Sequence, residues 1–329
     1  MPNNSDKNMT THPHRIVSFF SGCGGLDLGF LGGFKFKGET LRKLPFEIIA
    51  AYDHDDKCVK TYNENINEHA LVGDLSKAKD YFSNMPKAEI LIGGFPCQDF
   101  SSCGPKAGLT SNRGKLYKAL VKYMDAHEPK VVVAENVVHL ERIGKGEVIK
   151  TILKDLKRAG THGYDFQVWK LEAPDYGVPQ NRTRLFFVGV RKDIKYRPTI
   201  PTATHTNSYR SIDWAIADLE NIADESVPNQ SQYFKASKAK KGNGQGDETN
   251  TLGQPSYTIR ANAKSRVHFH YKLSRRLTVR ECARLQTFPD DFIFPFSATT
   301  NVMQIGNAVP PLLAHHVGRS IAKFMDVIS

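Results

Sequence analysis

The chain has 329 residues, of which 40% are hydrophobic and 24% are charged, and its formal net charge is +11 at pH 7. This length allows one large domain or two ordinary ones, and no apolar run approaches the roughly 18 residues that a membrane span needs. Five cysteines at irregular spacings argue against a disulfide framework and a zinc site, so the sequence predicts a cytoplasmic protein without a metal or a membrane partner.

The N-terminal half of the chain alternates apolar runs with helical patterns. The first fourteen residues are polar and predict a disordered tail over 1–14, followed by a catalytic and cofactor-binding domain over 15–191. Alternating strands and helices indicate βαβ units, and hence a Rossmann-like, mostly parallel α/β sheet. The predicted strands are 16–20, 46–52, 90–92, 131–134, 166–171 and 185–190, and the predicted helices are 26–31, 57–65, 116–124 and 145–159.

The alternation stops at residue 192. Residues 192–272 are irregular and polar, and 191–272 contains 13 Lys and Arg against 8 Asp and Glu, which favours a polyanionic partner, solubility being the alternative. This segment predicts a smaller recognition domain. Residues 273–329 then return to the catalytic domain, with helices predicted over 278–286 and 307–324.

A glycine turn follows the first predicted strand, in the order Ser21, Gly22, Cys23, Gly24, Gly25. Such a turn lets the backbone approach a cofactor closely. The third glycine of a dinucleotide fingerprint would fall at Asp27, so a nicotinamide cofactor is disfavoured and another adenosyl cofactor is predicted. Asp53, just beyond the second strand, is placed to hold ribose hydroxyls, and Asp74 ends a further predicted strand.

Cys97 follows Pro96 on a glycine-rich loop at the end of predicted strand 90–92. A cysteine thiolate is a strong nucleophile where it is exposed. Glu135 ends the strand 131–134, where an apolar setting raises a carboxyl pKa and makes a proton donor. Two arginines, Arg182 and Arg184, offer guanidinium donors at the start of another strand.

Taken together, these stretches resemble a cytosine-C5 DNA methyltransferase of the bacterial type. The resemblance covers nearly the whole chain from Ile16 and rests on eight motifs in the family's order. They are FSGCGGLDLGF, the acidic residue of YDHD, GD, GGFPCQDFS, AENV, DYGVPQNRTR, RRLTVRECARLQTFPDDF and QIGNAVPP.

The resemblance implies a role for each candidate catalytic residue. Cys97 would add to carbon 6 of a flipped-out cytosine, Glu135 would bind and protonate ring N3, and Arg184 would bind the O2 oxygen. Arg182 would support the loop and its charge. The methyl donor would be S-adenosylmethionine, and residues 94–114 would form a mobile loop over the target base. Cys103, in that loop, is expected to be a small hydrophobic residue rather than a second nucleophile.

The resemblance also implies the cofactor contacts. Asp53 stands where the family often has glutamate, and His54 stands where tryptophan is common, so stacking on the adenine is expected to be weaker. The implied cofactor residues are Phe19, Ser21, Gly22, Cys23, Gly24, Gly25, Leu26, Asp53, His54, Asp74, Leu75, Pro96, Leu116, Asn307, Ala308 and Val309.

The basic segment would be the target-recognition domain. Thr258 and Ile259 resemble a threonine-aliphatic pair that such domains place near the target phosphate, with 251–252 as a rival match. Arg260 and Arg266 are predicted to read bases, and Lys240 and Lys241 to meet phosphates. The predicted partners are double-stranded DNA and a cognate restriction endonuclease without a stable complex, and the protein is predicted to be a monomer.

Three alternatives remain at this point. A tRNA cytosine-5 methyltransferase would use the same chemistry, although the cysteine-containing motif of that group is not found. A catalytically inactive DNA-binding homologue is disfavoured because Cys97, Glu135 and Arg184 are all retained. A nicotinamide oxidoreductase is disfavoured by Asp27.

Overall fold

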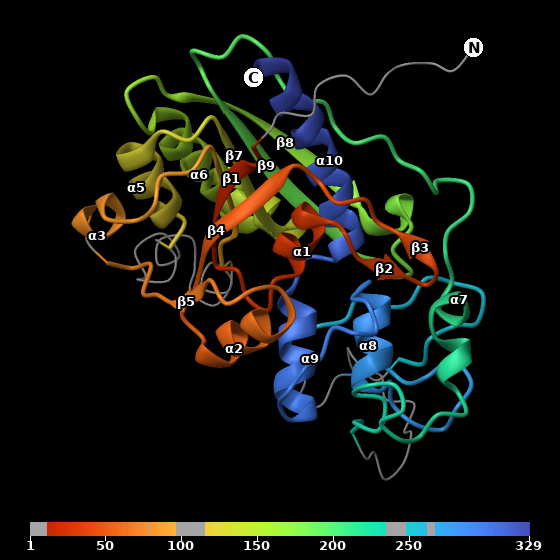
Figure 1. Cartoon of the computed structure of the whole chain (residues 1–329). Coiled ribbons are helices and arrows are strands. Elements are labelled where there is room, and N and C mark those ends of the chain that lie inside the picture. Colours follow the sequence, from red (N-terminus) through yellow and green to blue (C-terminus); the bar gives the residue numbers. More distant parts are fainter. Residues whose placement is uncertain (1–11, 78, 97–115, 235–247, 262–266) are drawn as a thin grey trace, which may run out of the picture.

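The computed structural model describes residues 12–77, 79–96, 116–234, 248–261 and 267–329 (Figure 1). Five residues singled out in the sequence lie outside the described residues, and so does the tail up to residue 11. These five are Cys97, Cys103, Lys240, Lys241 and Arg266.

Seven strands form one sheet in the order β5-β4-β1-β6-β7-β9-β8. Every neighbouring pair is parallel except those made by β9, which is antiparallel to both β7 and β8, so the predicted mostly parallel sheet is confirmed. A short 3₁₀ turn, rather than a helix, joins β8 to β9, and a connection without a crossover returns the chain antiparallel. The strands are β1 (His14–Phe19), β4 (Phe46–Asp53), β5 (Ala70–Val72), β6 (Ile90–Gly94), β7 (Val131–Val137), β8 (Tyr164–Glu172) and β9 (Thr183–Arg191).

Helices cover both faces of this sheet, because alternate residues of the central strands point to opposite sides. On β1, Ile16 packs into one core and Val17 into the other, and both side chains are fully buried. Helices α1 (Gly25–Leu31), α2 (Asp56–Asn65) and α10 (Pro311–Ile328) supply residues to the first core. The second core takes residues from α3 (Lys79–Ser83), α5 (Lys118–His127) and α6 (Glu147–Arg158).

The C-terminal helices differ from the prediction of one helix over 307–324. Helix α9 (Ala298–Asn307) ends where that helix was expected to begin, and α10 starts at Pro311. Ala308 is extended, with φ −66° and ψ 151°. Pro310 disfavours the helical conformation in the residue before it, so the chain breaks between the two helices.

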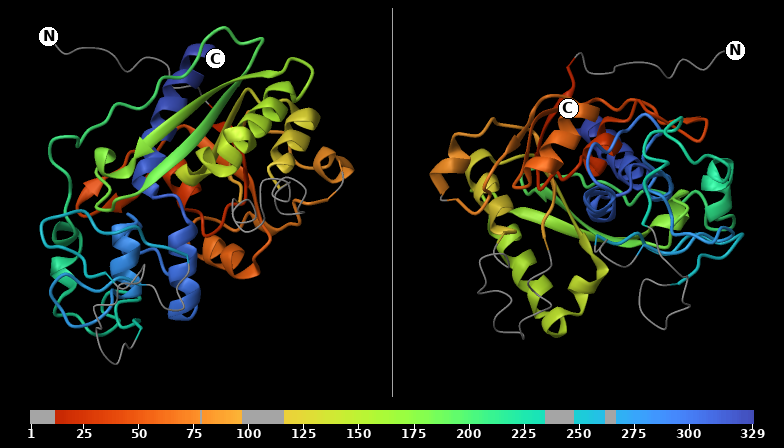
Figure 2. Two further views of the ribbon diagram at one scale, coloured as in Figure 1. Left: turned by 180° about the vertical axis from the view of Figure 1, so that it is seen from behind. Right: turned by 90° about the horizontal axis from the view of Figure 1, so that it is seen from below.

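A small lobe lies beside the sheet domain, below it in Figure 1. It contains α7 (Ile212–Ile216), α8 (Val279–Leu285) and α9, and its β-structure within the described residues consists of isolated bridges. Residues 192–211 first run back along the sheet domain, where Tyr176 Oη donates to the Pro201 carbonyl and the Thr204 amide donates to the Asp175 carbonyl (Figure 2). The lobe itself therefore begins near Ser211.

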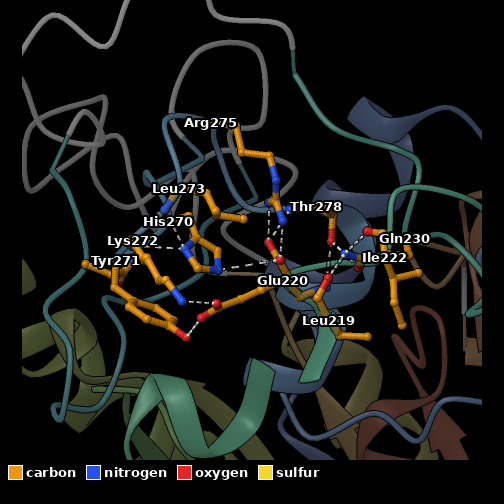
Figure 3. A network of polar contacts seen from close by, with 12 residues as sticks. Leu219, Glu220, Ile222, Gln230, His270, Tyr271, Lys272, Leu273, Arg275 and Thr278 are labelled. Carbon is orange, nitrogen blue, oxygen red and sulfur yellow. Dashed lines mark hydrogen bonds and ion pairs between the residues drawn. The ribbon is translucent and has the colours of Figure 1, made fainter. Parts of the chain in front are cut away.

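A buried polar network holds the base of this lobe (Figure 3). Glu281 in the first turn of α8 accepts two hydrogen bonds from Arg275, at 2.8 and 2.7 Å, and forms a capping box with Thr278. The Nδ1 atom of buried His270 accepts from the amides of Lys272 and Leu273. In this part of the lobe, side-chain hydrogen bonds therefore hold backbone that is not paired in a β-sheet.

Three of the cysteines, Cys23, Cys58 and Cys282, are buried free thiols. No described group of three or more His, Cys, Asp and Glu residues is arranged to hold a metal ion. Among the described helices, none is long and apolar enough to cross a membrane.

Candidate active site

The candidate site lies along one edge of the sheet. Strands β1, β4, β6 and β7 run parallel, so their carboxyl ends meet at this edge. Gly94 at the end of β6 pairs with Glu135 on β7, and a side chain at Gly94 would come within 3.0 Å of the Glu135 carboxylate. The edge therefore brings together the predicted cofactor turn, the strand that leads to Cys97, and Glu135.

The glycine turn after β1 has open space on one side and a closely packed segment on the other. Gly22 has φ +55°, and no atom lies within 4 Å of where its side chain would be, so the space beside it is open. A Cβ on Gly25 would lie 2.4 Å from the Val309 carbonyl oxygen, so the segment after α9 packs directly on the turn. This contact places Ala308 and Val309, far apart in sequence from the turn, in the predicted cofactor site.

Asp53 closes the turn from β4. Its carboxylate accepts hydrogen bonds from the Gly22 amide at 2.8 Å and from the Asp55 amide at 2.9 Å. Burial acts to raise the pKa of this carboxyl, but the hydrogen bonds that it accepts outweigh burial and lower the pKa of Asp53. An ionised carboxylate at this place suits ribose hydroxyls.

Two further groups fit a polar adenosyl ligand. The Ser21 hydroxyl is buried and has no hydrogen-bond partner within the described part of the chain, and a bound ligand would supply one. The side chain of His54 is 86% exposed beside Asp53, with 3.2 Å between Nδ1 and the carboxylate. The residues present therefore fit the predicted S-adenosylmethionine.

The remaining predicted cofactor residues divide between the core and the rim. Leu75 is buried, whereas Asp74 is exposed and accepts hydrogen bonds from Ser76. Cys23 donates its thiol to the Gln304 carbonyl, which also points it away from solvent. Gly24 and Leu26 are buried, Pro96 and Leu116 are half-buried, and Asn307 is exposed.

The sequence identified Phe19 in this turn, but the structure places its ring in the core. The ring packs on Tyr52, Phe82 and Tyr123, with centroids 5.8, 5.9 and 5.3 Å away, and it is fully buried. The next residue, Phe20, is half-buried at the end of β1 and has φ 53°. Phe20 is thus the aromatic side chain at the open edge, and no sequence pattern shows its unusual backbone conformation.

Glu135 and Arg184 form a buried ion pair. The Arg184 Nε atom lies 2.7 Å from Glu135 Oε1, and the side chains are 11% and 10% exposed, respectively. Burial raises the pKa of the Glu135 carboxyl, and the nearby guanidinium groups of Arg184 and Arg182 oppose this shift without cancelling it. The next residue, Asn136, donates to the Phe95 carbonyl at 2.9 Å and so fixes the chain that leads to Pro96.

Arg182 has a different position from Arg184. Its guanidinium donates to the carbonyl oxygens of Ile259, Gly306 and Ala308, at 3.0, 2.8 and 2.9 Å. These contacts join the loop before β9 to the small lobe at two places, Ile259 and the C-terminal end of α9. Arg182 therefore contacts these backbone carbonyls and not Glu135, an arrangement that suits the supporting role predicted for it.

The small lobe meets the site at Thr258 and Ile259. Thr258 Oγ1 donates to the Asn181 carbonyl, and Ile259 is buried. In the rival match, Leu252 is 63% exposed. The structure thus brings 258–259, rather than 251–252, against the loop that carries the two arginines.

Comparisons with known proteins agree with this geometry. A model of the family C-5 cytosine-specific DNA methylase matches residues 14–254 and 220–323. The Type II methyltransferase M.NgoFVII of Neisseria gonorrhoeae is 33% identical over 345 residues, covering 96% of this chain and 88% of that protein. The Type II methyltransferase M.BsuRI of Bacillus subtilis is 33% identical over 363 residues, covering 94% and 79%.

Solved structures share the fold. The Entamoeba histolytica methyltransferase EhMeth superimposes with a TM-score of 0.69 at 16% identity, covering 96% of this chain and 99% of that one. The Dnmt2 methyltransferase of S. pombe gives a TM-score of 0.68 at 16% identity, with the same coverage.

Proposed function

This chain belongs to the C-5 cytosine-specific DNA methylase family and methylates carbon 5 of cytosine in DNA, and we propose that Cys97, Glu135 and Arg184 carry this reaction. The observation that supports the proposal is the buried pair of Glu135 and Arg184 beside the end of β6. Cys97 is three residues beyond the end of that strand.

Nucleophilic attack by Cys97 solves the main difficulty of the reaction, since carbon 5 of cytosine is too electron-poor to take a methyl group unaided. The thiolate sulfur forms a bond to carbon 6, and the electron pair of the 5,6 double bond moves toward carbon 5 and N3. The base must leave the DNA stack for this attack, because a duplex keeps carbon 6 out of reach.

Glu135 serves the same step from the other side of the ring. A carboxyl whose pKa is raised by burial is poised to hold a proton on ring N3, which draws electrons away from carbon 6. Arg184 holds Glu135 in place at 2.7 Å and offers its remaining donors to the O2 oxygen of the base. Once carbon 5 carries the transferred methyl group, loss of its proton to solvent restores the double bond and expels the Cys97 thiolate.

The methyl donor is S-adenosylmethionine, whose sulfonium supplies an electrophilic methyl group when it is bound. The open space beside Gly22, the Asp53 carboxylate and the unpartnered Ser21 hydroxyl are the groups proposed to hold it. The segment of Ala308 and Val309 closes the same turn.

The small lobe is proposed to choose the DNA sequence. Residues 192–272 form the proposed recognition domain, in which Thr258 contacts the target phosphate and Arg260 reads a base. Arg266, Lys240 and Lys241 lie outside the described residues and keep their predicted roles. We further propose a cytoplasmic monomer that protects sites cut by a companion endonuclease, as the names of the Type II relatives support.

Covalent capture tests the proposed nucleophile. Incubation with S-adenosylmethionine and duplex DNA in which 5-fluorocytosine replaces cytosine should give a stable protein–DNA adduct, because fluorine blocks the final elimination. Cys97→Ser should give no adduct and no methylation, since a serine hydroxyl is far less nucleophilic near neutral pH. Bisulfite sequencing of DNA from expressing cells maps the target site, with tRNA assayed alongside; adduct formation by the serine variant would remove Cys97 from the mechanism.

A further inference from the structure

A closed ring of hydrogen bonds lies where the small lobe meets the sheet domain. The Gln180 side chain accepts from the Ile259 amide at 3.0 Å and donates to Gln286 Oε1 at 2.6 Å. Gln286 Nε2 donates to the Ala308 carbonyl, which also accepts from Arg182 at 2.9 Å. Arg182 completes the ring by donating to the Ile259 carbonyl at 3.0 Å. These five residues are called the junction ring below.

The junction ring is buried and polar. Gln180 and Gln286 have no exposed surface, and Arg182 and Ile259 are each 3% exposed. The positive charge of Arg182 faces three carbonyl oxygens, two of which belong to the C-terminal end of α9, where the helix dipole is negative. In such surroundings the loss of one partner leaves another polar group unpaired, so the ring favours one arrangement over all slipped ones.

The ring joins the three parts of the enzyme that must act on the same base. Ile259 directly follows Thr258 in the proposed recognition domain, and Arg182 lies two residues before Arg184. Ala308 packs on the cofactor turn, because a Cβ on Gly25 would lie 3.0 Å from the Ala308 side chain.

Gly306, two residues before Ala308, shows how closely α9 and the recognition segment approach each other. A Cβ on Gly306 would lie 2.4 Å from the carbonyl carbon of Arg260. The backbone of the recognition segment therefore lies directly on α9, with no side chain between them. A shift of 258–260 would have to move α9 or break the junction ring.

We propose that the junction ring positions the recognition segment on the catalytic edge, so that Gln180, Arg182 and Gln286 determine sequence discrimination without contacting DNA or cofactor. The proposal rests on the family's DNA methylation activity. In this arrangement, when residues 258–260 contact the correct DNA sequence, the target base is placed correctly at Glu135 and Arg184. A loosened ring would let near-matching sites reach the same placement.

The test compares two DNA duplexes. One carries the site mapped by bisulfite sequencing, and the other carries the same site with one base pair changed, other than the pair that contains the methylated cytosine. The kcat/KM ratio between them should fall about tenfold in Gln286→Met, on the scale that one base pair contributes to specificity. The ratio should fall less in Arg182→Lys, which keeps the positive charge but lacks the planar guanidinium fork. Loss of folded protein lowers both rates equally and leaves this ratio unchanged, so the ratio separates positioning from simple destabilisation.

Asn181→Ala provides the matched control on the same loop. The Asn181 side chain is exposed, and among the described residues it donates to the Pro255 carbonyl, at 3.3 Å, so its removal should leave the ratio unchanged. Hydrogen exchange of a peptide covering 256–261, relative to one covering β4, gives a second answer without turnover, and Gln286→Met should speed it. Parental ratios in both ring variants, or parental exchange at 256–261, would overturn the proposal. A parent protein that methylates neither duplex would instead contradict the assigned function, and the exchange experiment would still test the ring.

Discussion

In the sheet domain Glu135 and Arg184 lie on strands joined by continuous backbone ladders, whereas in the small lobe side chains bind much of the backbone. Glu135 is flanked by β6 on one side and β9 on the other. In the lobe, Asn229 both donates to the Phe294 carbonyl and accepts from its amide, at 2.9 Å each. Gln230 likewise binds the carbonyls of Leu219 and Ile222.

This difference fits the two tasks. A ladder fixes the backbone of every residue of a strand through its neighbours, so the backbone position of Glu135 depends little on which side chains lie nearby. A framework held by individual Asn, Gln and Arg side chains leaves the intervening loops free to vary in length and sequence. The proposed catalytic residues Glu135 and Arg184 therefore lie in the sheet domain, which strand ladders hold. The proposed choice of DNA sequence depends on the small lobe, whose loops individual side chains hold.

Removing the proton donor Glu135 should give the largest effect, which is a slower methylation reaction. This effect should arise in the sheet domain and not in the small lobe. Glu135→Gln keeps a hydrogen-bonding side chain beside Arg184 but cannot donate a proton as readily, so single-turnover methylation should slow by roughly two to four decades. Because the Glu135 pKa is raised, its protonated fraction falls as pH rises through that pKa. Parental activity should therefore decline at high pH, and the variant should lack that step; parental rates in the variant would remove Glu135 from the mechanism.

Breaking the polar network at the base of the lobe should have a smaller effect, on stability. Glu281→Gln removes the ion pair that Arg275 makes with a fully buried carboxylate, which should lower the free energy of unfolding by about 2–3 kcal/mol. Lys272→Gln is the matched control, because Lys272 is 64% exposed and its pair with Glu220 should contribute less than about 1 kcal/mol.

The two tryptophans allow this effect to be located. Trp169 lies on β8 of the sheet domain and Trp214 on α7 of the lobe, and the chain has no other tryptophan. Urea unfolding followed by Trp214 fluorescence in a Trp169→Phe background therefore reports on the lobe. Equal shifts for Glu281→Gln and Lys272→Gln would show that burial of the network adds nothing.

The sequence predicted the sheet domain well because its strands and helices follow regular hydrophobic periods. The mostly parallel sheet and the placement of Asp53 and Glu135 at strand ends followed from that pattern and from the motifs. In the lobe only the helix predicted over 278–286 has such a period, and it is confirmed as α8; the hydrogen bonds of Asn229 and Gln230 that hold the rest could not be predicted. The helix predicted over 307–324 is confirmed over 311–324 as part of α10, but its start was placed too early because Pro310 breaks the chain between α9 and α10.

Two features of the site were beyond sequence analysis for a different reason. Phe19 and Phe20 are adjacent and chemically identical, and only the backbone turn at φ 53° decides which ring faces the open edge. The partners of Arg182 could not be read from the sequence either, because the carbonyls that bind it come from residues 77 and 126 positions away in the chain. Long-range contacts of this kind leave no local pattern.

The most direct test of the division between chemistry and recognition is an exchange of residues 192–272 for the corresponding segment of a relative with a different target. The chimera keeps Glu135 and Arg184 on the sheet, as well as Cys97, so it should still form an adduct with 5-fluorocytosine DNA. Bisulfite sequencing should then show methylation at the donor's site. A chimera that still methylates the original site would show that sequence recognition lies outside the exchanged segment.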